Sequence, residues 1–62
     1  MMKLEDALTL WKGDKVKPKR KNQYQPDRWA TVQDVEITDV DGETFVDVLL
    51  DDGKWYGYKL LK

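Results

Sequence analysis

Residues 30–53, ATVQDVEITDVDGETFVDVLLDDG, decide the fold. They contain two Asp-Gly pairs, Asp41-Gly42 and Asp52-Gly53, and each pair follows a run that is rich in β-branched residues. An Asp-Gly pair between such runs favours a β-hairpin, because glycine adopts a positive φ without steric cost. This stretch therefore predicts a meander of antiparallel strands, in which residues 43–50 point alternate side chains into the core: Val46, Val48 and Leu50.

The strand predicted at residues 28–38 is the longest, and its alternation of apolar residues breaks. Its apolar residues fall into two pairs that would face opposite sides of the sheet: Ala30 with Val32, and Val35 with Ile37. A β-bulge at residues 33–34 would bring both pairs to the core. Such a bulge bends a strand sharply, which lets a few strands curl into a small barrel.

Three further segments complete the predicted sheet. Residues 15–19 form a short first strand, residues 54–59 form a fourth, and residues 60–61 form a short last strand. The polar stretch PKRKNQYQP at residues 18–26 is bracketed by prolines and predicts a loop.

The first twelve residues predict a helix that docks on this sheet. Leu4, Leu8 and Trp11 are spaced by four and three positions, which places them on one helical face, and Gly13 follows as a stop signal. A helix this short is marginal alone, so its apolar face must pack on something. A chain of 62 residues is one domain at most, and we expect the helix at 1–12 and the barrel at 13–62 to form a single unit.

The order of these segments resembles the small Src-homology-3-like barrels, such as Tudor and KOW modules. The resemblance rests on four motifs: GDKV at 13–16, ATVQDV at 30–35, VDVLLDDGK at 46–54 and LL at 60–61. It implies a mainly β fold, a five-stranded Src-homology-3-like small barrel with a short N-terminal α-helix. Such barrels serve many kinds of binding, and free-standing ones of this size are often encoded by phages.

The composition excludes the commonest catalytic arrangements. The chain has no Ser, no Cys and no His, so it cannot pair a hydroxyl or thiol nucleophile with an imidazole base. The segment DVDGE at 39–43 has its glycine at the wrong position for a calcium loop and is better explained as a hairpin turn. We therefore expect no enzymatic activity, no cofactor, no metal and no small-molecule substrate. No apolar run is long enough to span a membrane, so we expect a cytoplasmic protein.

The net charge of −1 conceals two blocks of opposite sign. Residues 12–28 hold seven basic and two acidic residues, a net of +5, whereas residues 33–53 hold eight acidic residues and no basic one. On a folded barrel these blocks would give a surface that is basic on one side and acidic on the other. Alternatively, the two blocks partly neutralise each other across the strands.

Two sets of residues are candidate binding sites. The first would bind nucleic acid, because basic residues next to an aromatic ring suit flexible strands; it comprises Lys15, Lys17, Lys19, Arg20, Lys21, Tyr24 and Arg28. The second would bind a protein, because so small a barrel cannot bury every large ring; it comprises Trp29, Trp55, Tyr56 and Tyr58. Alternatively, Trp29 and Trp55 pack with Trp11 over the mouth of the barrel.

A non-catalytic interaction module is the function that these patterns favour. The acidic block and the surplus aromatic residues fit a protein surface and would hinder close approach to DNA, so we expect a protein partner. Direct binding of nucleic acid through residues 15–28 is the alternative. Opposite charged faces also allow a homo-oligomer.

Overall fold

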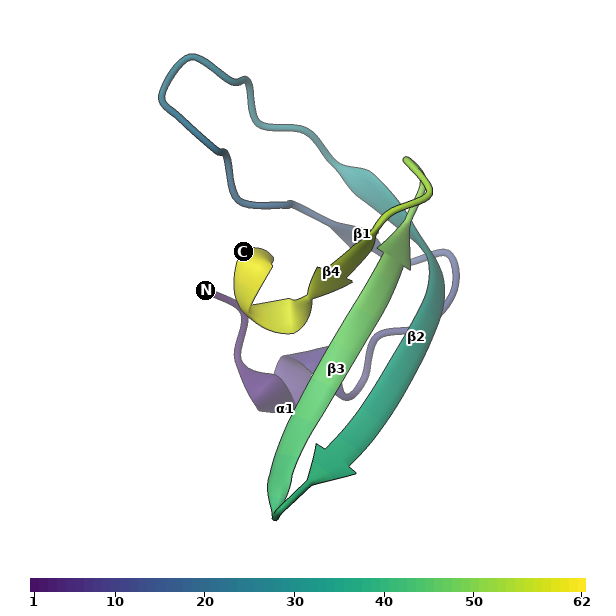
Figure 1. The fold of residues 1–62 in the computed structure, drawn as a ribbon. Coiled ribbons are helices and arrows are strands. Elements are labelled where there is room, and N and C mark those ends of the chain that lie inside the picture. The colour runs from purple at the N-terminus through teal and green to yellow at the C-terminus, as the bar shows by residue number, and fades with distance from the viewer.

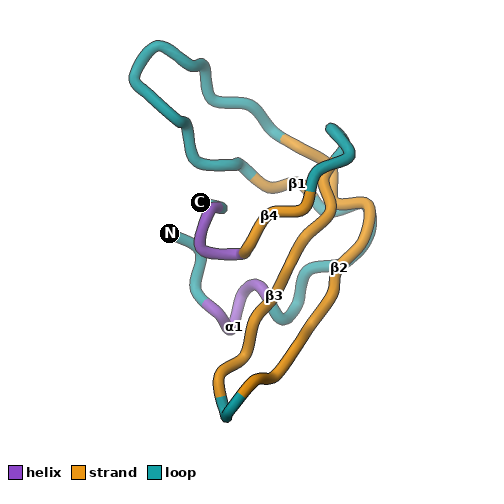
Figure 2. Tube along the Cα trace, viewed as in Figure 1, coloured by secondary structure: helices purple, strands orange, loops and turns teal.

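The computed structural model describes residues 1–62 and shows a four-stranded antiparallel sheet that curls into a half-barrel (Figure 1). The elements follow the chain in the order α1 (Leu4–Ala7), β1 (Lys15–Val16), β2 (Ala30–Val40), β3 (Glu43–Leu50), β4 (Trp55–Gly57) and the 3-10 helix η1 (Tyr58–Leu60). The strands lie in the same order in the sheet. Figure 2 shows that a long loop joins β1 to β2 and projects away from the sheet. No helix is both long and apolar enough to cross a membrane.

The hairpin between β2 and β3 forms at the predicted Asp-Gly pair. Asp41 and Gly42 have positive φ angles of 51° and 80°, and Val40 pairs with Glu43 on either side of them. Two consecutive positive φ angles define a type I′ turn, whose twist matches that of the flanking strands. The segment at 39–43 is therefore a hairpin, as the sequence predicted. The second turn is also confirmed, with Gly53 at φ 79°.

The predicted bulge lies in β2. Val32 pairs with Leu50 and Asp34 with Leu49, so Gln33 is the extra residue between them. Ala30 and Val32, which precede the bulge in the sequence, are buried, and Val35, which follows it, is half-buried. The prediction that Ile37 joins the core is wrong: it faces the core side but is 52% exposed. Ile37 lies in the part of β2 that extends beyond β1, so no other strand covers its free edge.

Eight buried residues form the core, and all are apolar. They come from every part of the chain: Ala7, Val16, Ala30, Val32, Val46, Val48, Leu50 and Leu61. The three predicted core residues of β3 are all among them, and the observed limits of β3 match the predicted ones.

The N-terminal helix is shorter than predicted. α1 spans only Leu4–Ala7, and Leu8 and Trp11, which were expected on its buried face, are 45% and 63% exposed. The chain turns after α1 and joins the sheet where Gly13 N donates to the Val32 carbonyl. The N-terminal residues that pack on the core are Met2, Leu4, Ala7 and Leu10. These contacts determine the path of the N-terminal segment, because so short a helix has little stability of its own.

The predicted fifth strand is reduced to one β-bridge. Pro18 pairs with Leu61, whereas Leu60 belongs to η1 and is 55% exposed. The first and fourth strands are likewise shorter than predicted, ending at Val16 and Gly57. Proline lacks an N–H, so the segment after β1 cannot extend regular pairing through this position. Backbone hydrogen bonds on both sides of the bridge still tie the chain end to this segment: Lys19 N to Leu60 O and Lys62 N to Lys17 O, each 2.8 Å.

Candidate binding surfaces

The outer face of β2, β3 and β4 carries apolar side chains among acidic ones. Strand register places Leu49 between Asp34 and Trp55, and the next row places Asp47 between Glu36 and Gly57. These residues alternate with the buried ones along each strand, so they share the face that points away from the core. We call this surface the acidic-aromatic face; it comprises Asp34, Glu36, Phe45, Asp47, Leu49 and Trp55.

Two aromatic rings of this face are accessible. Trp55 is 49% exposed and Phe45 is 40% exposed. Both rings point away from the core, because the adjacent core-side positions are occupied by Val46 in β3 and by Tyr56 in β4. Partly exposed aromatic residues surrounded by polar ones are typical of protein contact surfaces.

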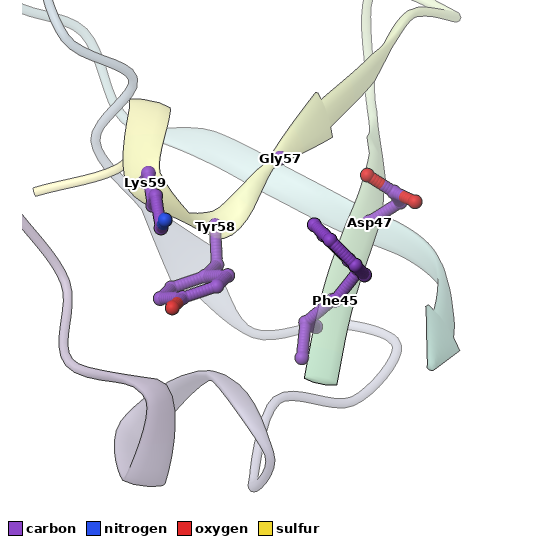
Figure 3. Close-up of a pocket in the computed structure, with 6 residues that line it drawn as sticks. Phe45, Asp47, Gly57, Tyr58 and Lys59 are labelled. Atoms are coloured by element: carbon purple, nitrogen blue, oxygen red, sulfur yellow. The ribbon is translucent and has the colours of Figure 1, made fainter. Parts of the chain in front are cut away.

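A small pocket lies at one end of this face. Figure 3 shows Phe45 and Asp47 reaching it from β3, and Tyr58 and Lys59 reaching it from the chain segment after Gly57. Its volume is about 100 Å³, below the 300–1,000 Å³ that is typical of small-molecule sites. Gly57 helps to leave this space open, since it has no side chain. The pocket has room for one side chain of a partner, with Asp47 and Lys59 as the charged groups beside it.

A second surface lies where β1 and the chain after it meet the start of β2. Lys17 Nζ lies 4.9 Å from the centroid of the Trp29 ring, and Trp29 is 64% exposed. This is a cation–π contact, and a ring so exposed can still stack with a ligand. Lys15 Nζ donates to the Thr31 hydroxyl nearby. We call this region the basic-aromatic surface; it comprises Lys15, Lys17 and Trp29, and it continues into the loop that carries Lys19, Lys21 and Tyr24.

The loop at residues 18–26 is organised by hydrogen bonds of its own. The Asn22 side chain accepts from the backbone N–H groups of Tyr24 and Gln25 at 2.9 and 3.1 Å, and the Gln25 side chain accepts from Lys21 N at 2.9 Å. Asn22 thus closes a turn that the sequence alone did not assign. The turn presents Tyr24 to solvent, where its side chain is 86% exposed.

Ion pairs engage the two arginines that were predicted to bind nucleic acid. Arg28 contacts Asp51 at 3.1 Å and Asp52 at 3.5 Å, and Arg20 contacts Asp27 at 3.4 Å. Asp27 also accepts from Lys62 at 3.1 Å. The basic and acidic blocks therefore neutralise each other in part, which was the alternative interpretation of the charge pattern. The lysines of residues 15–21 form no ion pair.

These contacts shift the pKa values of the groups involved. The backbone N–H of Thr31 and then Arg28 lower the pKa of Asp51. The Tyr56 hydroxyl, which donates to Asp52, lowers the pKa of that carboxyl and has its own pKa raised in return. Asp51 in turn raises the pKa of Arg28. The Tyr56 hydroxyl therefore has a structural role, because it donates to Asp52 in the turn that follows β3.

The structure separates the four aromatic residues of the predicted protein-binding set. Trp55 lies on the acidic-aromatic face, whereas Trp29 lies beside Lys17. Tyr56 and Tyr58 are half-buried and pack against the core, although Tyr58 also lines the pocket. The alternative in which the tryptophans pack together over the barrel is wrong, since each is about half exposed or more.

Phe45 and Leu49 were not in either predicted site. Their positions, one step out of phase with the core residues of β3, are the signal that identifies them as outward-facing.

Comparison of the chain with protein-family models, curated proteins and solved structures found no match.

Proposed function

We propose that this protein is a non-catalytic interaction module that binds a protein partner through its acidic-aromatic face. The observation that carries the proposal is the exposure of Trp55 beside Leu49, with Asp34 completing the same row of the sheet. A large ring on a rigid strand loses little conformational freedom on binding, which is why tryptophan is enriched at the energetic centres of interfaces.

The charges around Trp55 define the partner. Residues 33–53 contain no basic residue, and the outward-facing Asp34, Glu36 and Asp47 form no ion pair within the chain. A partner segment with lysine or arginine next to apolar side chains would complement both properties. The pocket beside Phe45 would hold one of the partner's side chains.

We also propose that the half-barrel is a variant of the Src-homology-3-like barrel. Three observations support this assignment: the strand order, the bulge at Gln33, and the bridge between Pro18 and Leu61. The fifth strand of the expected barrel would be reduced to that bridge. A cytoplasmic location fits this role and a chain without cysteine.

A peptide-display screen with matched variants tests the function. We expect the selected peptides to combine basic and apolar residues, and Trp55→Ala to weaken their binding by about tenfold or more. Trp29→Ala removes a tryptophan that is more exposed than Trp55 but lies outside this face, and it should change the affinity less than about twofold. Selected peptides that bind Trp55→Ala as well as the natural protein would contradict the proposal.

Nucleic acid is the second candidate ligand, and the contact of Lys17 with Trp29 favours it. This contact brings a cation and an exposed ring together, and Tyr24 offers another ring on the adjacent loop. Base stacking and phosphate neutralisation need these two kinds of group. The ion pairs of Arg20 and Arg28 leave mainly lysines to contact phosphate.

The same two variants separate the candidates. If nucleic acid is the ligand, a short single-stranded oligonucleotide should bind more weakly to Trp29→Ala, and its affinity should fall steeply with salt concentration. Trp55→Ala should then bind it normally. Retention of full affinity by Trp29→Ala, or affinity that does not change with salt, would rule out this mode of binding.

A further inference from the structure

One edge of β2 has no strand partner along most of its length. β1 pairs only with Ala30 and Thr31, whereas β3 pairs with β2 as far as Val40. Residues 36–40 are all exposed. Figure 1 shows this end of β2 running along the outside of the sheet, with β3 as its only neighbouring strand.

The hairpin register shows which backbone groups face this free edge. Val40 and Glu43 flank a two-residue turn, so they form a hydrogen-bonded pair, and every second residue of β2 from Val40 bonds to β3. The residues between them, Ile37 and Asp39, direct both N–H and C=O outward. None of the backbone hydrogen bonds outside the regular elements involves residues 33–49, so these groups are unpaired within the chain.

The free edge has a defined beginning. Val35 also directs its backbone N–H and C=O toward this edge, although its side chain is on the core side. Its N–H donates to the side chain of Asp34 at 2.8 Å. Asp34 therefore satisfies the Val35 N–H next to the bulge, so the unpaired N–H groups of the edge begin at Ile37. The Asp39 side chain accepts from the Thr44 hydroxyl at 2.6 Å, which keeps that carboxylate on the core side of the hairpin and away from the edge.

Charge determines what can pair with this edge. Asp34 and Glu36 lie along its outer side, and the acidic block contains no basic residue, so a second copy of β2 would bring like charges together. A basic strand would instead be attracted. Glu36 points to the outer face and Ile37 to the core side, so a complementary strand would carry basic residues on its outer side and apolar residues on its inner side.

We propose that the edge of β2 from Ile37 to Val40 binds an extended segment of a partner protein, which adds to the sheet as an antiparallel strand with alternating basic and apolar residues. This inference rests on the proposed function and specifies how the partner binds. Antiparallel addition continues the arrangement of the whole sheet and forms the more stable type of pair. The partner's apolar residues, which lie opposite Ile37 and Asp39, are then the ones whose N–H groups bond to β2.

Four end-blocked peptides of eight residues test this register. The parent alternates lysine and valine, and a charge control alternates glutamate and valine. The other two are N-methylated versions of the parent, one at every valine and one at every lysine. Changing the peptide leaves the protein fold untouched, which a proline substitution in β2 would not guarantee.

We expect the lysine–valine peptide to bind and to slow amide hydrogen exchange at Ile37 and Asp39. Methylation at valine should weaken binding by about tenfold or more, since it removes the N–H groups that face β2, whereas methylation at lysine should have little effect. The glutamate–valine peptide should not bind. Exchange at Val35 should change least, because its N–H already has an acceptor.

Three results would overturn strand addition in the proposed register: no binding of the parent peptide, equal binding of both methylated peptides, or loss of binding only on methylation at lysine. If methylation of the peptide does not change its affinity but the Trp55→Ala substitution lowers it, the proposed function stands and only the role of the edge is removed. If the parent peptide and the selected peptides all bind Trp55→Ala normally while methylation at valine still matters, the edge stands and the proposed face fails.

Discussion

Arg28 Nη1 donates a hydrogen bond to Asp51 Oδ1 at 3.1 Å and so joins the basic block of the sequence to the acidic one. The same guanidinium reaches Asp52, which also accepts from the Tyr56 hydroxyl. These side chains connect the start of β2 to the turn after β3. Exposed ion pairs of this kind add little stability at neutral pH. Their carboxyl groups nevertheless make the free energy of unfolding depend on pH in the acid range.

We expect the protein to lose stability as the pH falls below about 4. The pKa values of Asp51 and Asp52 are lower in the folded chain than their ordinary value of 3.8. Their ionised forms therefore stabilise the fold above pH 3.8, and this contribution disappears as the pH falls through the lowered values. Thermal unfolding followed by circular dichroism between pH 7 and pH 2 measures the loss.

Arg28→Gln is the control for that experiment. It should reduce the acid-induced fall in melting temperature but not abolish it, because the Thr31 N–H still bonds to Asp51 and the Tyr56 hydroxyl to Asp52. Asp27, whose pKa Lys62 lowers most, should continue to contribute. An acid response in Arg28→Gln equal to that of the natural protein would contradict a role for the guanidinium.

Deletion of Gln33 should unfold the domain. This residue is the extra one in the bulge, so its loss shifts the register between the two parts of β2 by one position. If the hairpin keeps its pairing, Ala30 and Val32 turn to the outer face and leave the core. Burial of a valine contributes about 1.5–3 kcal/mol, which is a large share of the few kcal/mol that stabilise a domain of this size.

The substitution Gln33→Ala keeps the number of residues in β2 and removes only the Gln33 side chain, so it tests whether the bulge or the side chain is needed. Gln33 is exposed and its side chain makes no hydrogen bond, so this variant should melt within a few degrees of the natural protein. A deletion variant that melts as cooperatively and at the same temperature as the natural protein would show that the bulge is dispensable.

The sequence identified the features that depend on local geometry. The turns at Gly42 and Gly53 require positive φ, and the bulge follows from a break in the alternation of apolar residues within one strand. The ends of the chain were predicted less well, because contacts between distant residues determine them. Leu61 pairs with Pro18, and no local signal in the sequence specifies that contact.

The candidate sites were predicted in part for the same reason. Trp55 was assigned to a contact surface because so small a barrel cannot bury every large ring, and it is 49% exposed. The contact between Trp29 and Lys17 joins two segments that are separated by a long loop, and the sequence therefore assigned the two residues to different sites. The pairing of Arg28 with Asp51 spans 23 positions and was foreseen only as general neutralisation between the blocks.

Leu61→Ala and Leu60→Ala should have very different effects although the residues are adjacent. The Leu61 side chain is fully buried, whereas Leu60 is 55% exposed. Truncation of a buried leucine costs about 2–5 kcal/mol, so Leu61→Ala should unfold most of the protein at room temperature or lower its melting temperature by more than ten degrees. Leu60→Ala should shift the melting temperature by only a few degrees. Equal effects would mean that Leu61 does not close the core.

Gly57→Ala and Gly53→Ala should change stability in opposite directions. Gly57 has φ −63° and ψ 144°, which any residue adopts, and an added Cβ would lie 3.9 Å from Asp47 Oδ1, an ordinary contact distance. Alanine there restricts the unfolded chain and should stabilise the protein by about 0.4–1 kcal/mol. Gly53 has φ 79°, so alanine at that position should cost about 1–2 kcal/mol.

The same pair of variants tests whether the pocket takes part in binding. The methyl group of Gly57→Ala would enter the space beside Asp47, so a partner side chain held there should bind more weakly even though the domain is more stable. Gly53→Ala destabilises the turn after β3 but leaves the pocket open, and below its melting temperature it should bind the selected peptides normally. Calorimetric melting and peptide titration of both variants measure these effects. Unchanged peptide affinity in Gly57→Ala would place the partner's contacts on Trp55 and the edge of β2 alone.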